Sequence, residues 1–215
     1  SSFFTLLLLL WQLIISAFDI QPLIFPGPSD VAIALYQGFT SGELIRHTGV
    51  TFYEVIIGFA LGAASGFILG ALIGQIRILE TLLSPYVVAF QTLPKVALAP
   101  LFVVWFGFGM TSKVIITATI VFFPVMVNTI TGLRSVSREQ TDMLRAFTAS
   151  RWQVFRMAQF PHALPYVFAG LDIGLGLAVI GALVGEFVGA PAGLGYLIMP
   201  RNASLDIPGG SEQRR

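Results

Sequence analysis

Long apolar runs alternate with short polar segments along the chain, and five of these runs are long enough to cross a lipid bilayer as helices. They fall at about residues 3–20, 50–74, 85–106, 113–132 and 163–187. A crossing helix needs roughly 17 to 25 mostly apolar residues, because every backbone polar group must find its partner within the segment. The pattern predicts an all-α, polytopic membrane protein with about five transmembrane helices.

The first apolar run, SSFFTLLLLLWQLIISAF, has the length of a secretory signal peptide as well as that of a membrane span. A signal peptide begins with a basic segment and ends at a cleavage site of small residues. No basic residue precedes this run, and no convincing cleavage site follows it. We therefore interpret it as a retained span.

The positions of the arginines predict the orientation. The segment 133–162 contains five arginines, at positions 134, 138, 145, 151 and 156, and only two acidic residues, at 139 and 142. Because loops rich in Lys and Arg stay in the cytoplasm, this segment is expected to be cytoplasmic. The turn at 75–80 and the N-terminus then lie on the same side, and the connection 18–49 lies outside. Within that connection, the weakly amphipathic stretch 31–44 is expected to lie along the membrane surface.

Composition excludes several classes of function. Only 11% of the residues are charged, against about 25% in an ordinary soluble domain. The net charge of +1 gives no basic surface for nucleic acid, and the absence of cysteine removes disulfide and thiol chemistry. His47 and His162 are far apart and have no acidic neighbours at ligand spacing, so neither a metal site nor a cofactor is expected.

Glycines at a spacing of four residues occur in two of the spans. They stand at positions 58, 62, 66, 70 and 74 in one; in the other, Gly170 and Gly174 form a pair, and 181, 185 and 189 form a second set. Small residues four apart form a groove along a helix that lets a second backbone approach closely. These faces are predicted to pack against other helices, and a ligand pressed against a glycine face is the alternative.

Charged residues inside the apolar runs suggest a path for a solute. In QTLPKVALAP, Lys95 stands between two prolines that interrupt a helix at membrane depth. Irregular backbone at that depth is tolerated where it lines a wet cavity, so Lys95, Glu54 and Glu186 are candidates for a translocation path. Alternatively, Lys95 and Glu186 reach the membrane surface or pair with each other. Asp172 is a further ionisable residue in a span.

Two capping signals divide the cytoplasmic segment. Ser137 with Gln140, and Ser150 with Gln153, have the spacing of a capping box, which predicts two short helices that begin directly after the two serines. Apolar residues share a face on each helix: 143, 144 and 147 on the first, and 154, 155 and 158 on the second. An apolar stripe with arginines beside it suits a groove on a soluble partner, and packing against the chain's own helix ends fits equally well.

The segment DMLRAFTASRWQVFRMAQFPHALP resembles the cytoplasmic coupling loop of ATP-binding cassette importer permeases, whose pattern is E-A-A, three residues, Gly, nine residues and I-x-L-P. Asp142 takes the Glu position, Thr148 the Gly position and Pro161 the closing Pro position. The Gly of the family ends the first helix in a tight turn, and a Thr lacks its easy left-handed conformation. The resemblance implies that the ATPase docks on Asp142, Ala146, Thr148, Ala149, Ser150, Arg151, Trp152, Phe155 and Pro161.

Four further segments resemble the branch of this family that imports nitrate, sulfonates, taurine and pyrimidine precursors. They are FPGPSDV, LPKVALAPLFVVWFGFG, FFPVMVNTITGL and GEFVGAPAGLGYLI, in the order expected for the branch. Such permeases continue into one more transmembrane helix, whereas here a polar segment follows. We therefore interpret residues 1–198 as the permease domain, expect the tail 199–215 to be disordered, and expect a truncation or frame shift near Met199.

The resemblance implies the permease subunit of a type I importer in the plasma (inner) membrane, working as a homodimer. Its expected partners are cytoplasmic ATP-binding cassette subunits, an extracytoplasmic solute-binding protein and a second permease copy. The chain has no P-loop, so ATP hydrolysis is assigned to the partner and no catalytic residue is expected in this chain. A proton-coupled secondary transporter that uses Glu54, Asp172 and Glu186 is the alternative, and an inactive assembly fragment is a third reading.

Overall fold

The computed structural model describes residues 2–17 and 26–203, and every regular element within these ranges is a helix. In chain order the elements are α1 (Ser2–Ala17), α2 (Pro28–Thr40), α3 (Glu43–Gln75), α4 (Arg77–Thr92), the 3-10 helix η1 (Lys95–Leu98), α5 (Ala99–Phe106), α6 (Met110–Arg134), α7 (Arg138–Ala146), α8 (Arg151–Val154), the π-helix η2 (Phe155–Gln159), α9 (Phe160–Gly189) and α10 (Leu194–Ala203).

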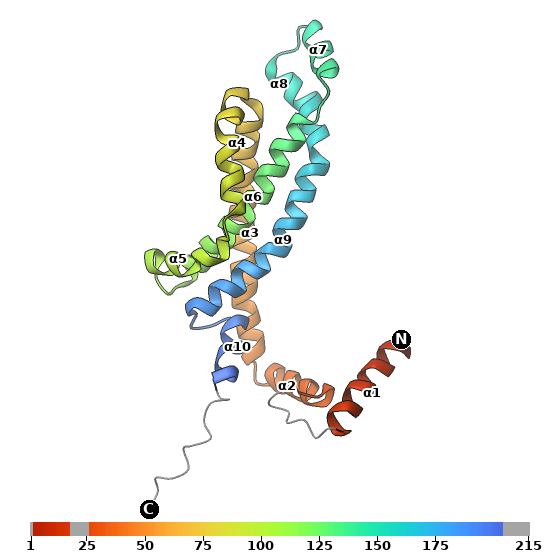
Figure 1. Ribbon diagram of the computed structural model, residues 1–215, viewed down its shortest axis with the longest axis vertical. Helices are drawn as coiled ribbons and strands as arrows, with labels where there is room; N and C mark the ends of the chain where they lie inside the picture. Colours follow the sequence, from red (N-terminus) through yellow and green to blue (C-terminus); the bar gives the residue numbers. More distant parts are fainter. Residues whose placement is uncertain (1, 18–25, 204–215) are drawn as a thin grey trace, which may run out of the picture.

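Three long helices, α3, α6 and α9, form the centre of the molecule and run side by side along its long axis (Figure 1). Their shared core consists of small and β-branched side chains, namely Val55, Ala63, Val121, Val125, Ala178 and Ala182, with Phe59, Phe67 and Leu171 packed around them. Such small residues keep the three helix axes close together. The predicted all-α membrane fold is confirmed.

The glycines at four-residue spacing are where α3 and α9 approach α6. A Cβ atom added to Gly66 would lie 2.5 Å from the carbonyl oxygen of Phe122, and one added to Gly70 would lie 2.7 Å from that of Met126. On α9, a Cβ at Gly170 would lie 3.2 Å from the carbonyl oxygen of Pro124. No side chain fits between these backbones, so the prediction that the glycine faces serve packing is confirmed.

Three of the five predicted spans correspond to single long helices. The runs 50–74, 113–132 and 163–187 lie within α3, α6 and α9, which are the parts of the described chain long and apolar enough to cross a membrane unbroken. The third of these spans forms one helical rod with the segment before it, from Arg151 to Gly189. The first predicted span corresponds to α1, whose apolar part, Phe3–Ile15, is shorter than a usual span, and its residues 18–20 lie outside the described residues.

The predicted interruption of the span at 85–106 is confirmed at Pro94, because the chain breaks in the middle of this run. Helix α4 ends at Thr92, and the segment Lys95–Phe106 continues at an angle of 81° to it. Leu93 has an extended backbone (φ −66°, ψ 134°), the conformation that a following proline favours, and Pro94 has no N–H to continue the helix. Pro100, in contrast, lies in the first turn of α5, where a missing N–H costs nothing.

The two ends of the bundle carry different elements. Helices α7 and α8 form a knob at one end, while α1, α2 and α10 lie toward the other (Figure 1). The stretch predicted to lie along the membrane surface is mostly α2, which has no buried residue. Helix α10 continues to Ala203, so the tail predicted to be disordered begins as helix, and residues 204–215 lie outside the described residues.

Candidate functional site

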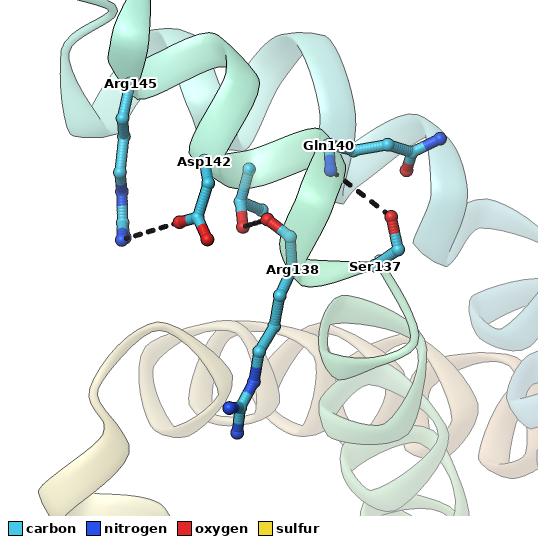
Figure 2. Close-up of polar contacts among 6 residues, drawn as sticks. Ser137, Arg138, Gln140, Asp142 and Arg145 are labelled. Carbon is cyan, nitrogen blue, oxygen red and sulfur yellow. Dashed lines mark hydrogen bonds and ion pairs between the residues drawn. The ribbon is translucent and has the colours of Figure 1, made fainter.

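The first helix of the knob begins where the sequence predicts it. The side chain of Ser137 caps α7 by accepting a hydrogen bond from the backbone N–H of Gln140, at 3.3 Å (Figure 2). Asp142 and Arg145 form an ion pair at 3.8 Å on the same helix, and both side chains are about 70% exposed. An exposed pair of this kind contributes little stability, so both charges remain available to another molecule.

The second helix of the knob begins with a complete capping box. The backbone N–H of Gln153 donates to Ser150 Oγ at 3.3 Å, and the backbone N–H of Ser150 donates to Gln153 Oε1 at 2.7 Å. Each bond satisfies a backbone group that the first turn of a helix leaves unpaired. Both predicted helix starts are confirmed.

Thr148 joins the two helices in a left-handed conformation. Its φ is +59°, the one positive φ at a non-glycine position in residues 2–17 and 26–203. The N–H of Thr148 donates to the carbonyl oxygen of Arg145 at 2.9 Å, and that of Ala149 donates to the carbonyl oxygen of Leu144 at 3.1 Å. These two bonds make a Schellman motif, a helix ending that normally uses glycine at this position. The left-handed position inferred from the resemblance is therefore present, with a β-branched residue in it.

Replacing Thr148 with glycine is expected to stabilise this turn. A left-handed residue other than glycine costs about 1 to 2 kcal/mol, which is partly offset here by a 2.7 Å bond from Thr148 Oγ1 to the carbonyl oxygen of Phe147. We expect the amide of Ala149 to exchange with solvent about fivefold more slowly in Thr148→Gly, measured by hydrogen exchange in nanodiscs. In the control, Ala149→Gly, exchange should quicken. Faster exchange in Thr148→Gly would contradict the strain assigned to this residue.

Large apolar side chains project from the knob. Phe147 is 76% exposed and Trp152 is 65% exposed, and Met143 and Met157 are also exposed. A soluble surface rarely presents so many large apolar groups together unless another protein covers them. This exposed set differs from the predicted faces, because Val154 is buried and turns toward the chain's own helices.

The rings of the second knob helix link its exposed surface to the bundle. Trp152 stacks on Phe155 with ring centroids 5.5 Å apart, and Phe155 lies 5.8 Å from Phe160. Phe160 in turn contacts Phe67 of α3 edge-to-face at 6.4 Å. Packed rings therefore connect Trp152 to the long helices. On this helix Val154 packs inward, as one of the two alternatives predicted, and Trp152 faces outward, so that insertion into a groove on a partner stays a prediction.

The residues that the resemblance implies for docking lie on or beside this surface. Asp142, Ala146, Thr148, Ser150, Arg151, Trp152 and Pro161 are exposed, and Ala149 and Phe155 are half-buried. Glu80 of α4 anchors the base of the knob through an ion pair with Arg134 at 2.6 Å.

A second group of polar residues is buried where α3, α6 and α9 meet, toward the opposite end from the knob. Glu54 and Glu186 are each 1% exposed, and Lys113 is 2% exposed. The Glu54 carboxyl faces that of Glu186 and lies within electrostatic range of Lys113. Glu54 Oε2 has no hydrogen-bond partner among the described residues, and Lys113 Nζ donates to the carbonyl oxygen of Gly109 at 3.1 Å.

Lys113 is the member of this group that the sequence analysis missed. It stands at the edge of an apolar run, where a lysine commonly reaches the membrane surface. The signal that could have found it is the presence of two carboxylates in neighbouring spans, since buried charges require counter-charges. Glu54 is near both Glu186 and Lys113. The alternative in which Lys95 pairs with Glu186 is wrong, because Lys95 Nζ instead donates to the carbonyl oxygen of Gln91 at 3.1 Å.

Helix α10 is held to the bundle by three side chains, two of which come from a distant part of the sequence. The consecutive N–H groups of residues 193, 194 and 195 donate to His47 Nδ1 at 2.9 Å, Thr51 Oγ1 at 2.8 Å and Glu186 Oε2 at 2.5 Å. Thr51 also donates to Glu186 Oε1 at 2.6 Å, and His47 stacks on Tyr196 with centroids 5.8 Å apart. These bonds satisfy the unpaired donors of the first turn and explain why a helix forms there.

Lys95 lies at the break between α4 and α5. Its Nζ is 4.8 Å from the ring centroid of Phe123, and the side chain borders a pocket of about 390 Å³. Asp172 is exposed on α9. Within residues 2–17 and 26–203, no three His, Asp or Glu side chains lie close enough together to hold a metal ion.

Comparison with known proteins places the chain in a family. The family model described as "Binding-protein-dependent transport system inner membrane component" matches residues 62–211. The riboflavin transport system permease protein RibX of Chloroflexus aurantiacus is 42% identical over 203 residues, which is 94% of this chain and 76% of the relative. The formylaminopyrimidine transport permease protein ThiX of Halalkalibacterium halodurans is 38% identical over 208 residues, covering 96% of this chain and 82% of the relative.

The similarity extends to a third relative, the taurine transport system permease protein TauC of Escherichia coli, which is 30% identical over 197 residues, covering 89% of this chain and 72% of the relative. Matches over nearly the whole chain agree with the helical bundle and its apolar spans. The chain therefore belongs to the binding-protein-dependent transport system inner membrane components, as a multi-pass permease subunit of an ATP-driven importer.

Proposed function

We propose that the knob between α6 and α9 is the coupling loop of this permease and that a cytoplasmic ATP-hydrolysing subunit docks on it. The observation that carries the proposal is the exposed apolar set of Met143, Phe147, Trp152 and Met157 on two capped helices. Two short helices with exposed aromatic and methionine side chains suit insertion into a groove. The predicted docking residues, from Asp142 to Pro161, lie on or beside this surface.

The ring contacts from Trp152 through Phe155 and Phe160 to Phe67 support a route for coupling. Movement of the docked ATPase would turn the knob, and the packed rings would pass that movement to α3 and α9. Because this family depends on a binding protein, we propose that an extracytoplasmic solute-binding protein delivers the solute to the opposite end. Two copies of the chain would surround the path between them.

The solute is proposed to be small and either anionic or heterocyclic. The relatives are named for riboflavin, formylaminopyrimidine and taurine, which are of these kinds. Along the path, we propose that Lys95 meets the solute. Glu54 and Glu186 are enclosed in this structure, so their proposed contribution is to hold the outer ends of α3 and α9 together between transport events.

Site-specific cross-linking tests the docking proposal, and the chain is suited to it because it has no cysteine. Ala146→Cys or Glu139→Cys, labelled with a maleimide-benzophenone, should form a photoadduct with the ATPase subunit in nanodiscs. Ser41→Cys, an exposed position at the other end of the bundle, is the matched control and should form none. No adduct from either loop position, or equal adducts from all three, would overturn the docking site.

A further inference from the structure

The end of helix α4 lies near a proline of helix α6. Helix α4 stops before Pro94, and Pro124 lies within α6, which continues unbroken from Met110 to Arg134. Between them lies a pocket of about 390 Å³, lined by Gln91, Lys95, Val96, Ile120, Phe123, Pro124, Val127, Asn128 and Leu177. A pocket of this volume has room for a small organic solute.

The polar groups of the pocket are mainly hydrogen-bond donors. Lys95 Nζ has three N–H donors, and one of them donates a hydrogen bond to the carbonyl oxygen of Gln91 at 3.1 Å. Gln91 also lines the pocket, and Asn128 Nδ2 donates to the carbonyl oxygen of Pro124 at 2.8 Å. Phe123 contributes a ring face beneath the ammonium group, with its centroid 4.8 Å away.

The charge of the pocket is positive. None of its lining residues is acidic, and Lys95 is the cation among them. A lysine at this depth is costly to desolvate unless water, a carboxylate or an anion meets it. The enclosed carboxyl of Glu54 lies near Glu186 and Lys113 instead, and neither glutamate lines the pocket of Lys95.

We propose that this pocket is an anion-selective solute site within the permease itself, formed by Lys95, Gln91, Asn128 and Phe123. The inference rests on the proposed function, because it deepens the assignment of Lys95 to the path. It adds a binding site along the path. There Lys95 would bind a sulfonate or carboxylate group of the solute, and Phe123 would contact the apolar or planar part of the same molecule. The competing role for Lys95 is capping the last turn of α4, where it bonds a carbonyl oxygen.

The pocket can be probed without knowing the solute. In the cysteine-free chain, Asn128→Cys places one thiol in the pocket. Its reaction rates are measured in nanodiscs with two methanethiosulfonate reagents, one carrying a sulfonate and the other a trimethylammonium group. The ratio of the two rates is the readout, because any effect of Lys95 on thiolate formation changes both rates equally.

An exposed thiol on α2, Tyr36→Cys, supplies the reference ratio, because no charged residue stands within four positions of it. We expect the ratio at Asn128→Cys to favour the sulfonate reagent by about tenfold over this reference. The ammonium group of Lys95, a few ångströms away, would attract the sulfonate and repel the trimethylammonium group. Adding Lys95→Met should return the ratio to the reference, and Lys95→Arg should keep it.

A ratio that Lys95→Met leaves unchanged, or a thiol at position 128 that neither reagent reaches, would overturn the site. Cross-linking of the ATPase to the knob does not depend on this pocket. A failed anion preference with intact cross-linking would therefore reject the solute site alone, whereas lost cross-linking with an intact preference would reject the docking surface.

Discussion

The variant Trp152→Ala is expected to weaken binding of the ATP-hydrolysing subunit by about thirtyfold, which corresponds to about 2 kcal/mol. Trp152 is 65% exposed in this chain and stacks on Phe155, so it is a large apolar surface held in one orientation. Tryptophans of this kind dominate the binding energy of many protein interfaces. The measurement is the dissociation constant between the permease in nanodiscs and the purified ATPase subunit.

The matched control for this variant is Tyr36→Ala. Tyr36 is 71% exposed on α2, at the opposite end of the bundle, and its loss should leave the affinity for the ATPase unchanged. The melting temperature of the permease should also stay the same in both variants, since neither ring is buried. Equal affinity in Trp152→Ala and the parent chain would contradict the docking surface.

The second large effect is expected on stability, in Lys113→Met. The change leaves the enclosed carboxyls of Glu54 and Glu186 facing each other without a nearby cation. Removing one partner from a buried group of charges typically costs about 3 to 5 kcal/mol. For a chain of this size we expect the melting temperature to fall by about 10 °C.

Two further variants test whether the loss of stability comes from the buried group and not from removing any lysine of the chain. Adding Glu54→Gln to Lys113→Met should restore a large part of the melting temperature, because it removes one of the two opposed carboxyls. Lys95→Met should change it little, because Lys95 borders an open pocket and its methionine replacement keeps most of the apolar stem. If Lys113→Met melts like the parent chain, Lys113 does not stabilise the two buried carboxyl groups.

The features that the sequence predicted well are those set by local chemistry. The capping serines, at 137 and 150, start helices because their hydroxyls satisfy backbone groups three residues away. The glycines of α3 predict close packing because their spacing alone makes a groove, whichever helix fills it. The left-handed conformation of Thr148 could be predicted because the spacing of the coupling-loop pattern places the family's glycine at this position.

Features that depend on the whole bundle could not be read from the sequence. The apolar run 85–106 has the composition of a span, but composition does not give the angle at which a chain leaves a proline break. Glu54, Lys113 and Glu186 are far apart in sequence and come together only when three helices pack. The hydrogen bonds of His47 and Thr51 to residues 193 and 194 likewise join segments about 145 positions apart.

Val154 shows a third kind of limit. The sequence places Val154 on the same helix face as Phe155 and Ala158. Which side of α8 turns inward depends on how α8 continues into the long helical rod that ends with α9, and the sequence does not give this. The π-helix at Phe155–Gln159 shifts the register between the two, so faces that coincide in an ideal helix diverge.

Uptake into proteoliposomes tests the central claim most directly. The permease would be reconstituted with its ATP-hydrolysing and solute-binding subunits, and import of labelled solute would be followed with and without ATP on the side of the knob. The account predicts import that requires ATP and persists when a protonophore abolishes the proton gradient. Import that proceeds without ATP and stops when the protonophore is added would contradict it, and would favour proton coupling through the membrane carboxylates.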